Sequence, residues 1–423
     1  MSKEPTERIA KPNNSLLRQI DLRQTFTALR HRNYRLWFIG QVISLFGTWM
    51  QMTAQGYFIY ELTHSPVYLG YVGFAAGIPT WIFMLWGGVI ADRISRRTLL
   101  IITQTAMMIL AFMLAGLTFS QIVEPWHIVA LAFLGGIANA FDAPARMAFV
   151  SEMVPREDMT NAIALNGAMF NTATAIGPAI SGLTYAAFGP GWCFTINGFS
   201  FIAVIIALWM MRMAPLDRRV TTRSVLSELA EGFRYLAKQP MIRTIIYLEA
   251  ITVIFGISFA ILIPAWAVNI LGGDATTNGL LQSARGLGAL VSALLIASLG
   301  RFQFKGKLIT VGSFAFPAML IAFSAMQWLP LSLVMLFCAG MAQILIFNMA
   351  NSLVQNLVDD KLRGRVMGIY SLNFFGFMPL GALWMGFWAE GLGSPITIAM
   401  SASVMLAFSI TFFFLAPKLR RLP

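Results

Sequence analysis

Long stretches with almost no charged residues recur along this chain, and they restrict the folds that it can adopt. Each is at least about 18 residues long, enough for an α-helix to span the hydrocarbon core of a bilayer. Only 11% of the 423 residues are charged, and 57% are hydrophobic. Soluble domains carry about 25% charged residues. The sequence therefore predicts a polytopic, all-α membrane protein and excludes a soluble domain held by one anchor.

The apolar stretches number twelve, and turn residues or charges separate them. Segment 147–170, after the fourth stretch, resembles segment 351–374, after the tenth, which indicates two parallel repeats. We therefore expect twelve transmembrane helices in two pseudo-symmetric bundles of six. The expected spans are 34–60, 67–91, 98–119, 126–148, 161–188, 192–212, 241–270, 277–299, 307–326, 331–353, 364–389 and 396–416.

Lysine and arginine are distributed unevenly between the two sides of this arrangement. None of the odd-numbered connections contains either residue, whereas both chain ends and the even-numbered connections are rich in them. By the positive-inside rule, both termini face the cytoplasm. An even number of spans independently requires both termini on one side. We expect a multi-pass protein of the inner (cytoplasmic) membrane.

The net charge of +12 comes from the same lysines and arginines of the chain ends and even-numbered connections. A strongly basic chain can indicate nucleic-acid binding. These charges are instead spread over short loops at one membrane face, where topology and attraction to anionic lipids explain them. We expect membrane lipids as partners and no nucleic acid.

The long connection 213–240 divides the two bundles. Within it, Val225, Leu229, Phe233 and Leu236 share one helical face, which predicts an amphipathic helix along the inner membrane surface. We interpret it as a structural linker, with partner binding as the alternative. The expected segments are a basic N-terminal segment (1–33), a first bundle (34–212), the linker (213–240), a second bundle (241–416) and a basic tail (417–423).

The sequence contains no recognisable motif for signal cleavage, metal binding or nucleotide binding. Residues 1–35 are polar and basic and the first apolar run is too long for a cleavable signal, so we expect a retained first span. Cys193 and Cys338 fall in expected spans and no Cys/His ligand set exists, so we expect neither a disulfide framework nor a metal site. GRFQFKGK (300–307) has the wrong glycine spacing for a phosphate loop, and Leu308 stands where Ser or Thr is needed. We expect no cofactor, no ATP-driven pump and no enzyme.

Four motifs carry a family resemblance. The stretch G-x-x-A-D-R-x-x-R-R (88–97) resembles the hallmark inner-loop motif of the major facilitator superfamily. HRNYRLWFIGQVISLFGTWMQ, FDAPARMAFV and GPAISGLTYAAFGPGW resemble its efflux branch of the transmembrane secretion effector type, akin to the drug:proton antiporter-3 group, which includes macrolide exporters, siderophore exporters and lysophospholipid transporters. The resemblance covers essentially the whole chain and says little about substrate.

The resemblance implies an inner gate in the loop between spans two and three. In the family, the matching aspartate and arginines hold the two halves together on the inner side when the transporter faces outward. The matching residues are Asp92, Arg93, Arg96 and Arg97. A purely topogenic basic loop is the alternative, which explains the arginines but not the aspartate. Asp142 and Arg146, four residues apart on one helical face, are expected to extend this gate, with substrate contact as the other reading.

Two sets of residues are candidates for the transport path. Span one carries five polar residues spaced by three or four, which favours a cavity wall, with helix packing as the alternative. They are Gln41, Ser44, Thr48, Gln51 and Gln55. Span five partly matches the antiporter motif, whose small residues and proline let the helix bend, although plain close packing also explains it. The matching residues are Gly177, Pro178, Ser181 and Gly182, whereas Ala164 and Ala173 replace glycines of the motif.

Two isolated charges lie within spans. Glu249 and Arg285 are each placed roughly 12 Å deep from opposite sides of the membrane, so neighbouring helices would allow them to meet. Intramembrane ionisable groups are candidates for proton or substrate coupling. A structural ion pair is the alternative, and both readings stay open.

The sequence as a whole predicts a secondary transporter that exports a small, partly apolar molecule in exchange for protons, and we expect it to be monomeric. A lysophospholipid flippase or a small-molecule importer on the same fold is the alternative. A non-transporting scaffold is the third class, but it would need neither a polar face on span one nor intramembrane charges.

Overall fold

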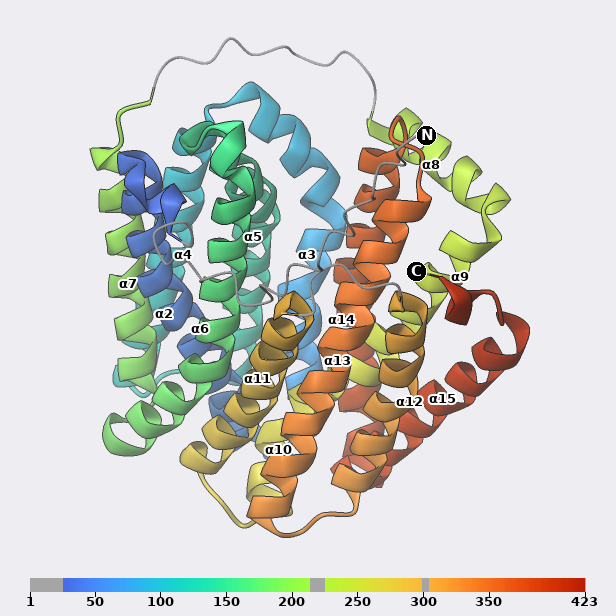
Figure 1. The fold of residues 1–423 in the computed structure, drawn as a ribbon. Helices are drawn as coiled ribbons and strands as arrows, with labels where there is room; N and C mark the ends of the chain where they lie inside the picture. Colours follow the sequence, from blue (N-terminus) through green and yellow to red (C-terminus); the bar gives the residue numbers. More distant parts are fainter. Residues whose placement is uncertain (1–25, 214–224, 299–303, 423) are drawn as a thin grey trace, which may run out of the picture.

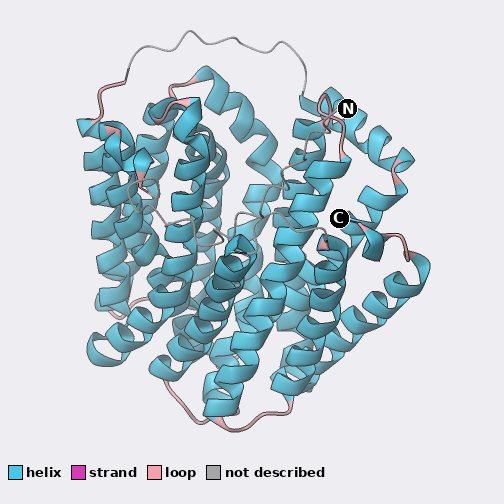
Figure 2. Ribbon diagram, in the orientation of Figure 1, coloured by secondary structure: helices cyan, strands magenta, loops and turns pink. Residues whose placement is uncertain are grey.

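The computed structural model describes residues 26–213, 225–298 and 304–422. The side chains of residues 84–93, 225–229 and 421 lie outside the described part. Throughout the described residues the regular structure is helical (Figure 2). Prolines begin many of the helices, because a proline at the first helical position loses no hydrogen bond and its φ already suits the helix.

The helices before residue 214 form the N-terminal bundle, on the left in Figure 1. They are α2 (Arg32–Thr63), α3 (Pro66–Arg93), α4 (Arg96–Phe119), α5 (Pro125–Met153), α6 (Met159–Phe188) and α7 (Pro190–Met210). The short helices η1 (Thr27–Arg30) and η2 (Arg156–Asp158) lie beside them.

The helices after residue 239 form the C-terminal bundle, on the right in Figure 1. They are α9 (Pro240–Ile251), η3 (Thr252–Gly256), η4 (Ile257–Leu262), α10 (Ile263–Asn269), α11 (Ala275–Ser298), α12 (Lys305–Ser324), α13 (Leu329–Leu357), α14 (Arg363–Leu392), α15 (Ser394–Leu415) and η5 (Leu419–Arg421). The segment from α9 to α10 corresponds to one expected span, broken by a π-helical turn at η3 and a 3₁₀ helix at η4.

Within the described residues, ten helical segments are long and apolar enough to cross a membrane. The helices α2 and α6 are as long but more polar, and they do not reach the same hydropathy. An all-helical membrane protein is therefore what the structure supports. The full count of twelve spans remains a prediction.

The linker helix α8 (Val225–Lys238) packs on one end of α14. Leu236 is buried, and Glu231 pairs with Arg365 at 2.6 Å. Phe233, expected on the same apolar face as Leu236, is 53% exposed. We call the end of the molecule that carries α8 the linker end, and the opposite end, with the turns at 63–66 and 392–394, the far end (Figure 1).

The two bundles meet along two seams, α6 against α11 and α3 against α14. Glycines make both seams possible. A Cβ on Gly279 would lie 2.4 Å from the Pro178 carbonyl oxygen, and one on Gly386 would lie 2.8 Å from the Gly70 Cα atom. Such close backbone approach is the usual role of small residues between membrane helices.

Hydrogen bonds between the bundles occur, within the described residues, only at the far end. Glu390 accepts from the Ser65 hydroxyl at 2.7 Å and from the Val67 backbone N–H at 3.3 Å. The Asn269 amide donates to the Tyr60 hydroxyl at 2.5 Å. The bundles are therefore fastened to each other at the far end.

Candidate functional site

Glu249 is a fully buried carboxyl group near the end of α9. Its exposed fraction is 0%, and Oε2 accepts a hydrogen bond from the Asn373 amide of α14 at 3.1 Å. Oε1 has no hydrogen-bond partner, although the Tyr370 hydroxyl lies nearby. An ionised carboxylate in such surroundings is costly because nothing neutralises it. Glu249 is therefore a buried acidic group whose hydrogen-bonding capacity the described residues satisfy only in part.

The backbone directly after Glu249 leaves the α-helical pattern. Residues Thr252–Gly256 form a π-helical turn, and Ile257–Leu262 continue as a 3₁₀ helix. The Ser258 hydroxyl donates to the Val253 carbonyl at 2.9 Å and satisfies one backbone group that the regular helix would have used. π-Helical turns inside helices are frequent at functional sites, because they place a side chain differently from a regular turn.

Arg285 lies on α11, ten residues after its start at Ala275. Its guanidinium donates to the Gln343 amide oxygen of α13 at 3.4 Å, a long hydrogen bond. Its Nε atom is buried without a partner. This cation is thus only weakly satisfied by the protein.

The structure does not bring Glu249 and Arg285 together in this conformation. Among the described residues the ion pairs do not include either group, and each instead contacts an amide on a different helix, Asn373 or Gln343. The ion pair considered from their depths is therefore absent here. The expected depths placed both residues at similar levels in the membrane. They did not show toward which neighbouring helix each side chain points.

The gate residues fall into two groups. The side chains of Asp92 and Arg93, at the end of α3, lie outside the described part. Arg96 donates to Glu152 at 2.9 Å and to the Ala148 carbonyl at 3.2 Å. Arg97 donates to the Trp209 carbonyl at 3.0 Å. In this conformation both described arginines therefore bind within the N-terminal bundle.

Asp142 is 1% exposed and sits in a hydrogen-bonded cluster between α4 and α5. It accepts from the Thr103 hydroxyl at 2.8 Å and from the Gln104 amide at 2.9 Å, while Arg146 Nε lies 3.6 Å away. The i, i+4 spacing predicted the contact with Arg146. Thr103 and Gln104 were missed, because no pattern in the sequence shows which face of α4 meets α5.

The polar face of α2 has two environments. Gln41 and Ser44 are buried, at 1% and 4% exposed, and the Gln41 Nε2 atom has no partner. Thr48, Gln51 and Gln55 are partly exposed, and Gln51 accepts from the Asn197 amide of α7 at 2.7 Å. The first two residues therefore pack within the N-terminal bundle, and the other three remain accessible.

The antiporter-like residues of α6 face two neighbouring helices, α11 and α2. A Cβ on Gly182 would approach the Ala275 carbonyl oxygen to 2.7 Å, and Pro178 faces Gly279 in the same seam. Ser181 is buried and donates to the Met50 carbonyl of α2 at 2.8 Å. Gly177 packs on Trp49, also of α2. The stretch thus touches both a neighbour in its own bundle and the opposite bundle.

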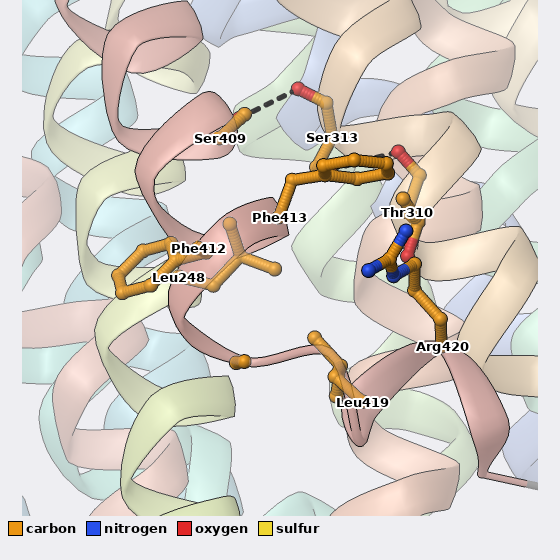
Figure 3. Close-up of a pocket in the computed structure, with 9 residues that line it drawn as sticks. Leu248, Thr310, Ser313, Ser409, Phe412, Phe413, Leu419 and Arg420 are labelled. Carbon is orange, nitrogen blue, oxygen red and sulfur yellow. Dashed lines mark hydrogen bonds between the residues drawn. The ribbon is translucent and has the colours of Figure 1, made fainter.

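A small cavity near η5 does not belong to this path. Its volume is about 10 Å³, and Figure 3 shows Ser409 donating to the Ser313 carbonyl and Arg420 beside Phe413. A space of that size holds about one water molecule. Among the described residues, no group of three His, Cys, Asp or Glu side chains is placed to hold a metal ion.

Comparison with known proteins assigns the family. The family described as transmembrane secretion effector matches residues 23–421. The staphyloferrin A transporter of Staphylococcus aureus is 24% identical over 403 residues, covering 91% of this chain and 97% of the relative. The multidrug efflux pump Tap of Mycolicibacterium fortuitum is 26% identical (83% and 87% covered), and the enterobactin exporter EntS of Shigella flexneri is 25% identical (92% and 93%).

Solved structures share the fold. A bacterial homologue of the human lysosomal transporter Spinster, inward-facing and unoccupied, gives a TM-score of 0.71 at 15% identity, covering 92% of this chain and 98% of that one. A D-xylose–proton symporter gives 0.69 at 12% identity, covering 93% and 98%. The chain therefore belongs to the transmembrane secretion effector family of the major facilitator superfamily, a family of multi-pass efflux transporters and not of enzymes.

Proposed function

We propose that this protein is a secondary transporter that exports a small, partly apolar molecule by alternating access, driven by proton entry. The observation that carries the proposal is the position of the hydrogen bonds between the bundles. Among the described residues, these bonds occur at the far end alone. Two bundles that rock about a site at the middle of the membrane need such an end state. Relatives named as exporters and efflux pumps support outward transport.

The linker end would face the cytoplasm. It carries Arg96, Arg97, Lys305 and Lys307, and basic residues favour the cytoplasmic side. The present conformation would then be inward-facing, with both termini cytoplasmic in an inner membrane. We propose that α2 and α6 also span the membrane, since with 32 and 30 residues they are long enough to do so, and that the protein acts as a monomer.

Glu249 is the proposed proton carrier. Glu249 is buried and no described cation lies within ion-pair distance of it, so it can exchange a proton with water only when its surroundings open. The π-helical turn Thr252–Gly256 gives the helix a place to change its backbone when the bundles rock. Release and uptake of the proton would then follow the conformational cycle.

The remaining candidates have supporting roles in the proposal. Asp92 and Arg93, together with Arg96 and Arg97, would close the linker end when the far end opens. Thr48, Gln51 and Gln55 would line the path, and the small residues of α6 around Gly182 would allow its seam to form and separate.

The test is uptake into everted membrane vesicles, where export from the cell becomes accumulation in the lumen. The compounds are macrolides, other drugs and siderophores, the classes that the relatives' names suggest. Wild-type vesicles should accumulate a substrate only while the lumen is acidic. Glu249→Gln should abolish this uptake yet leave downhill exchange measurable, whereas Asp360→Asn, a change at a carboxylate 86% exposed, should not.

Two results would contradict the proposal. One is uptake that persists at full rate after the pH gradient is collapsed. The other is normal gradient-driven uptake by Glu249→Gln at equal protein content in the membrane. If Glu249→Gln fails only because less protein is inserted, and Glu249→Gln with Arg285→Gln recovers proton-coupled uptake, the two charges have a structural role instead.

A further inference from the structure

Arg285 lies at the middle of the membrane-spanning part of the molecule. Ten residues separate it from the start of α11, and 13 from its end at Ser298. At about 1.5 Å per residue, it is roughly 15 Å from the far end of the helix, half the thickness of the hydrocarbon core. Charged side chains at this depth normally pair with a group of opposite sign.

Arg285 has no such partner among the described residues. Its contact is the neutral Gln343 amide at 3.4 Å, its Nε atom is buried without a hydrogen bond, and no described carboxylate lies within the 4.0 Å of an ion pair. Glu249, the nearest candidate by depth, is hydrogen-bonded to Asn373. A guanidinium has five N–H donors, most of which remain available here.

The backbone around Arg285 is fixed from both sides. A Cβ on Gly286 would lie 2.4 Å from the Thr174 carbonyl oxygen of α6, in the opposite bundle. A Cβ on Gly340 would lie 2.1 Å from the Arg285 carbonyl oxygen, on the side of α13. The arginine therefore stands next to the seam between the bundles, on a segment that cannot shift without disturbing either neighbour.

Further donors lie on the same helix. Asn278 and Gln282 precede Arg285 by seven and three residues, and this spacing places all three on one helical face. Gln282 donates to Asn278 Oδ1 at 3.2 Å, whereas the Asn278 Nδ2 atom is buried without an acceptor. This face of α11 therefore offers unused N–H donors together with one positive charge.

We propose that Arg285 binds a carboxylate of the transported molecule, so that the substrate class is small organic acids with a partly apolar body. A carboxylate matches two parallel guanidinium N–H groups and would neutralise the charge. The location beside the α6–α11 seam lets the bound acid contact both bundles. This inference rests on the proposed function, because it assigns the substrate of the same transport site.

The first experiment measures the electrostatic character of the site without a known substrate. In a background with Cys193→Ala and Cys338→Ala, Gln343→Cys is treated with methanethiosulfonate reagents bearing a sulfonate or a trimethylammonium group. The ratio of the two rates should favour the sulfonate and should fall about tenfold when Arg285→Gln is added, because a unit charge a few ångströms away is removed. Gln282→Cys serves as a second reporter if Gln343→Cys folds poorly.

The matched control is Arg243→Gln, which removes an exposed arginine of α9 and should leave the ratio unchanged. A ratio that does not respond to Arg285→Gln overturns the proposal. So does complete lack of reaction at both reporter positions, because a substrate site must be reached from water.

The second experiment addresses the class of molecule. Binding of two matched pairs to the purified protein is measured by calorimetry: naphthalene-2-carboxylate with naphthalene-2-carboxamide, and decanoate with decanamide. At least one acid should bind more than tenfold tighter than its amide, Arg285→Gln should abolish the difference, and Arg285→Lys should retain part of it. Equal binding of acids and amides, or binding of neither, overturns the proposal.

The two proposals fail in different ways. If the acids bind through Arg285 but vesicles show no gradient-driven uptake of any compound, the export function is wrong and the carboxylate site stands. If a neutral or cationic compound is exported equally well by Arg285→Gln, the export function stands and the organic-acid class is wrong.

Discussion

The Glu390 carboxylate at the end of α14 accepts a hydrogen bond from the Ser65 hydroxyl, 2.7 Å away, in the turn between α2 and α3. The same oxygen accepts the Val67 backbone N–H at 3.3 Å. One carboxylate thus joins the two bundles directly at the far end, where α3 and α14 also pack through Gly70 and Gly386. Opening of that end must break these contacts.

Glu390→Ala should shift the conformational equilibrium toward states open at the far end. The variant removes an acceptor that serves two donors at an exposed position, worth about 1 kcal/mol, which corresponds to roughly a fivefold change in the population ratio. Distances between spin labels on Leu62 and Leu392 would report the change. The control is Glu124→Ala, which removes an exposed carboxylate from another turn at the far end. Glu124 bonds to Trp126 of its own bundle, so this variant should leave the distances unaltered.

Gly286→Ala should act on the other seam. The new methyl group would come within 2.4 Å of the Thr174 carbonyl, so the seam between α6 and α11 must separate at this level. Overpacking of this kind costs about 1–3 kcal/mol. We expect a lower melting temperature and loss of the closed far end. Gly167→Ala on α6, where a Cβ meets nothing within 4 Å, is the control and should be as stable as the wild type.

The contact between His31 and Asp158 should make the linker end sensitive to acid. His31 donates to Asp158 at 2.7 Å, and this hydrogen bond lowers the pKa of the Asp158 carboxyl. A carboxyl with a lowered folded-state pKa contributes stability that is present above its unfolded pKa of about 3.9 and is lost as the pH falls through the folded value. Acid should therefore release η1 from η2.

Hydrogen exchange of Thr27–Arg30 would measure this release between about pH 6 and about pH 3, after correction for intrinsic rates. In the wild type, protection should fall toward the acidic end. Asp158→Asn should show weak protection at both ends of the range, whereas Glu157→Gln should resemble the wild type. Protection that does not depend on pH in the wild type would contradict the assignment.

The positions of the helices follow largely from the sequence, for identifiable reasons. The apolar runs show where each helix crosses the membrane. A proline at the first helical position begins α3, α5, α7 and α9 close to the expected boundaries. The helix α2 was expected over 34–60 and extends over Arg32–Thr63. The break at Thr252–Gly256 was not foreseen, because its one helix-disfavouring residue, Gly256, is tolerated inside regular helices.

The partners of the charged groups were predictable only within one helix. The spacing of Asp142 and Arg146 predicted their contact, since i and i+4 share a face. Asn373, Gln343 and Glu152 could not be found in this way, because each lies on a different helix from the charge that it contacts. Sequence periodicity gives the level of a residue along a helix and leaves open which neighbouring helix its side chain meets.

Asp142 provides the last prediction, because it is the other buried carboxylate among the described residues. Unlike Glu249, it is held by Thr103, Gln104 and Arg146, and we therefore expect it to have a structural role. Asp142→Ala should lower the free energy of unfolding by about 2 kcal/mol, since it removes the acceptor of the buried Thr103 and Gln104 donors and the carboxylate beside the partly exposed Arg146. Asp142→Asn keeps an acceptor and should be milder. Melting temperatures in one detergent would measure both, with the exposed Glu157→Gln as control. If Asp142→Asn melts like the wild type and yet loses only proton-coupled uptake, the carrier is Asp142 and not Glu249.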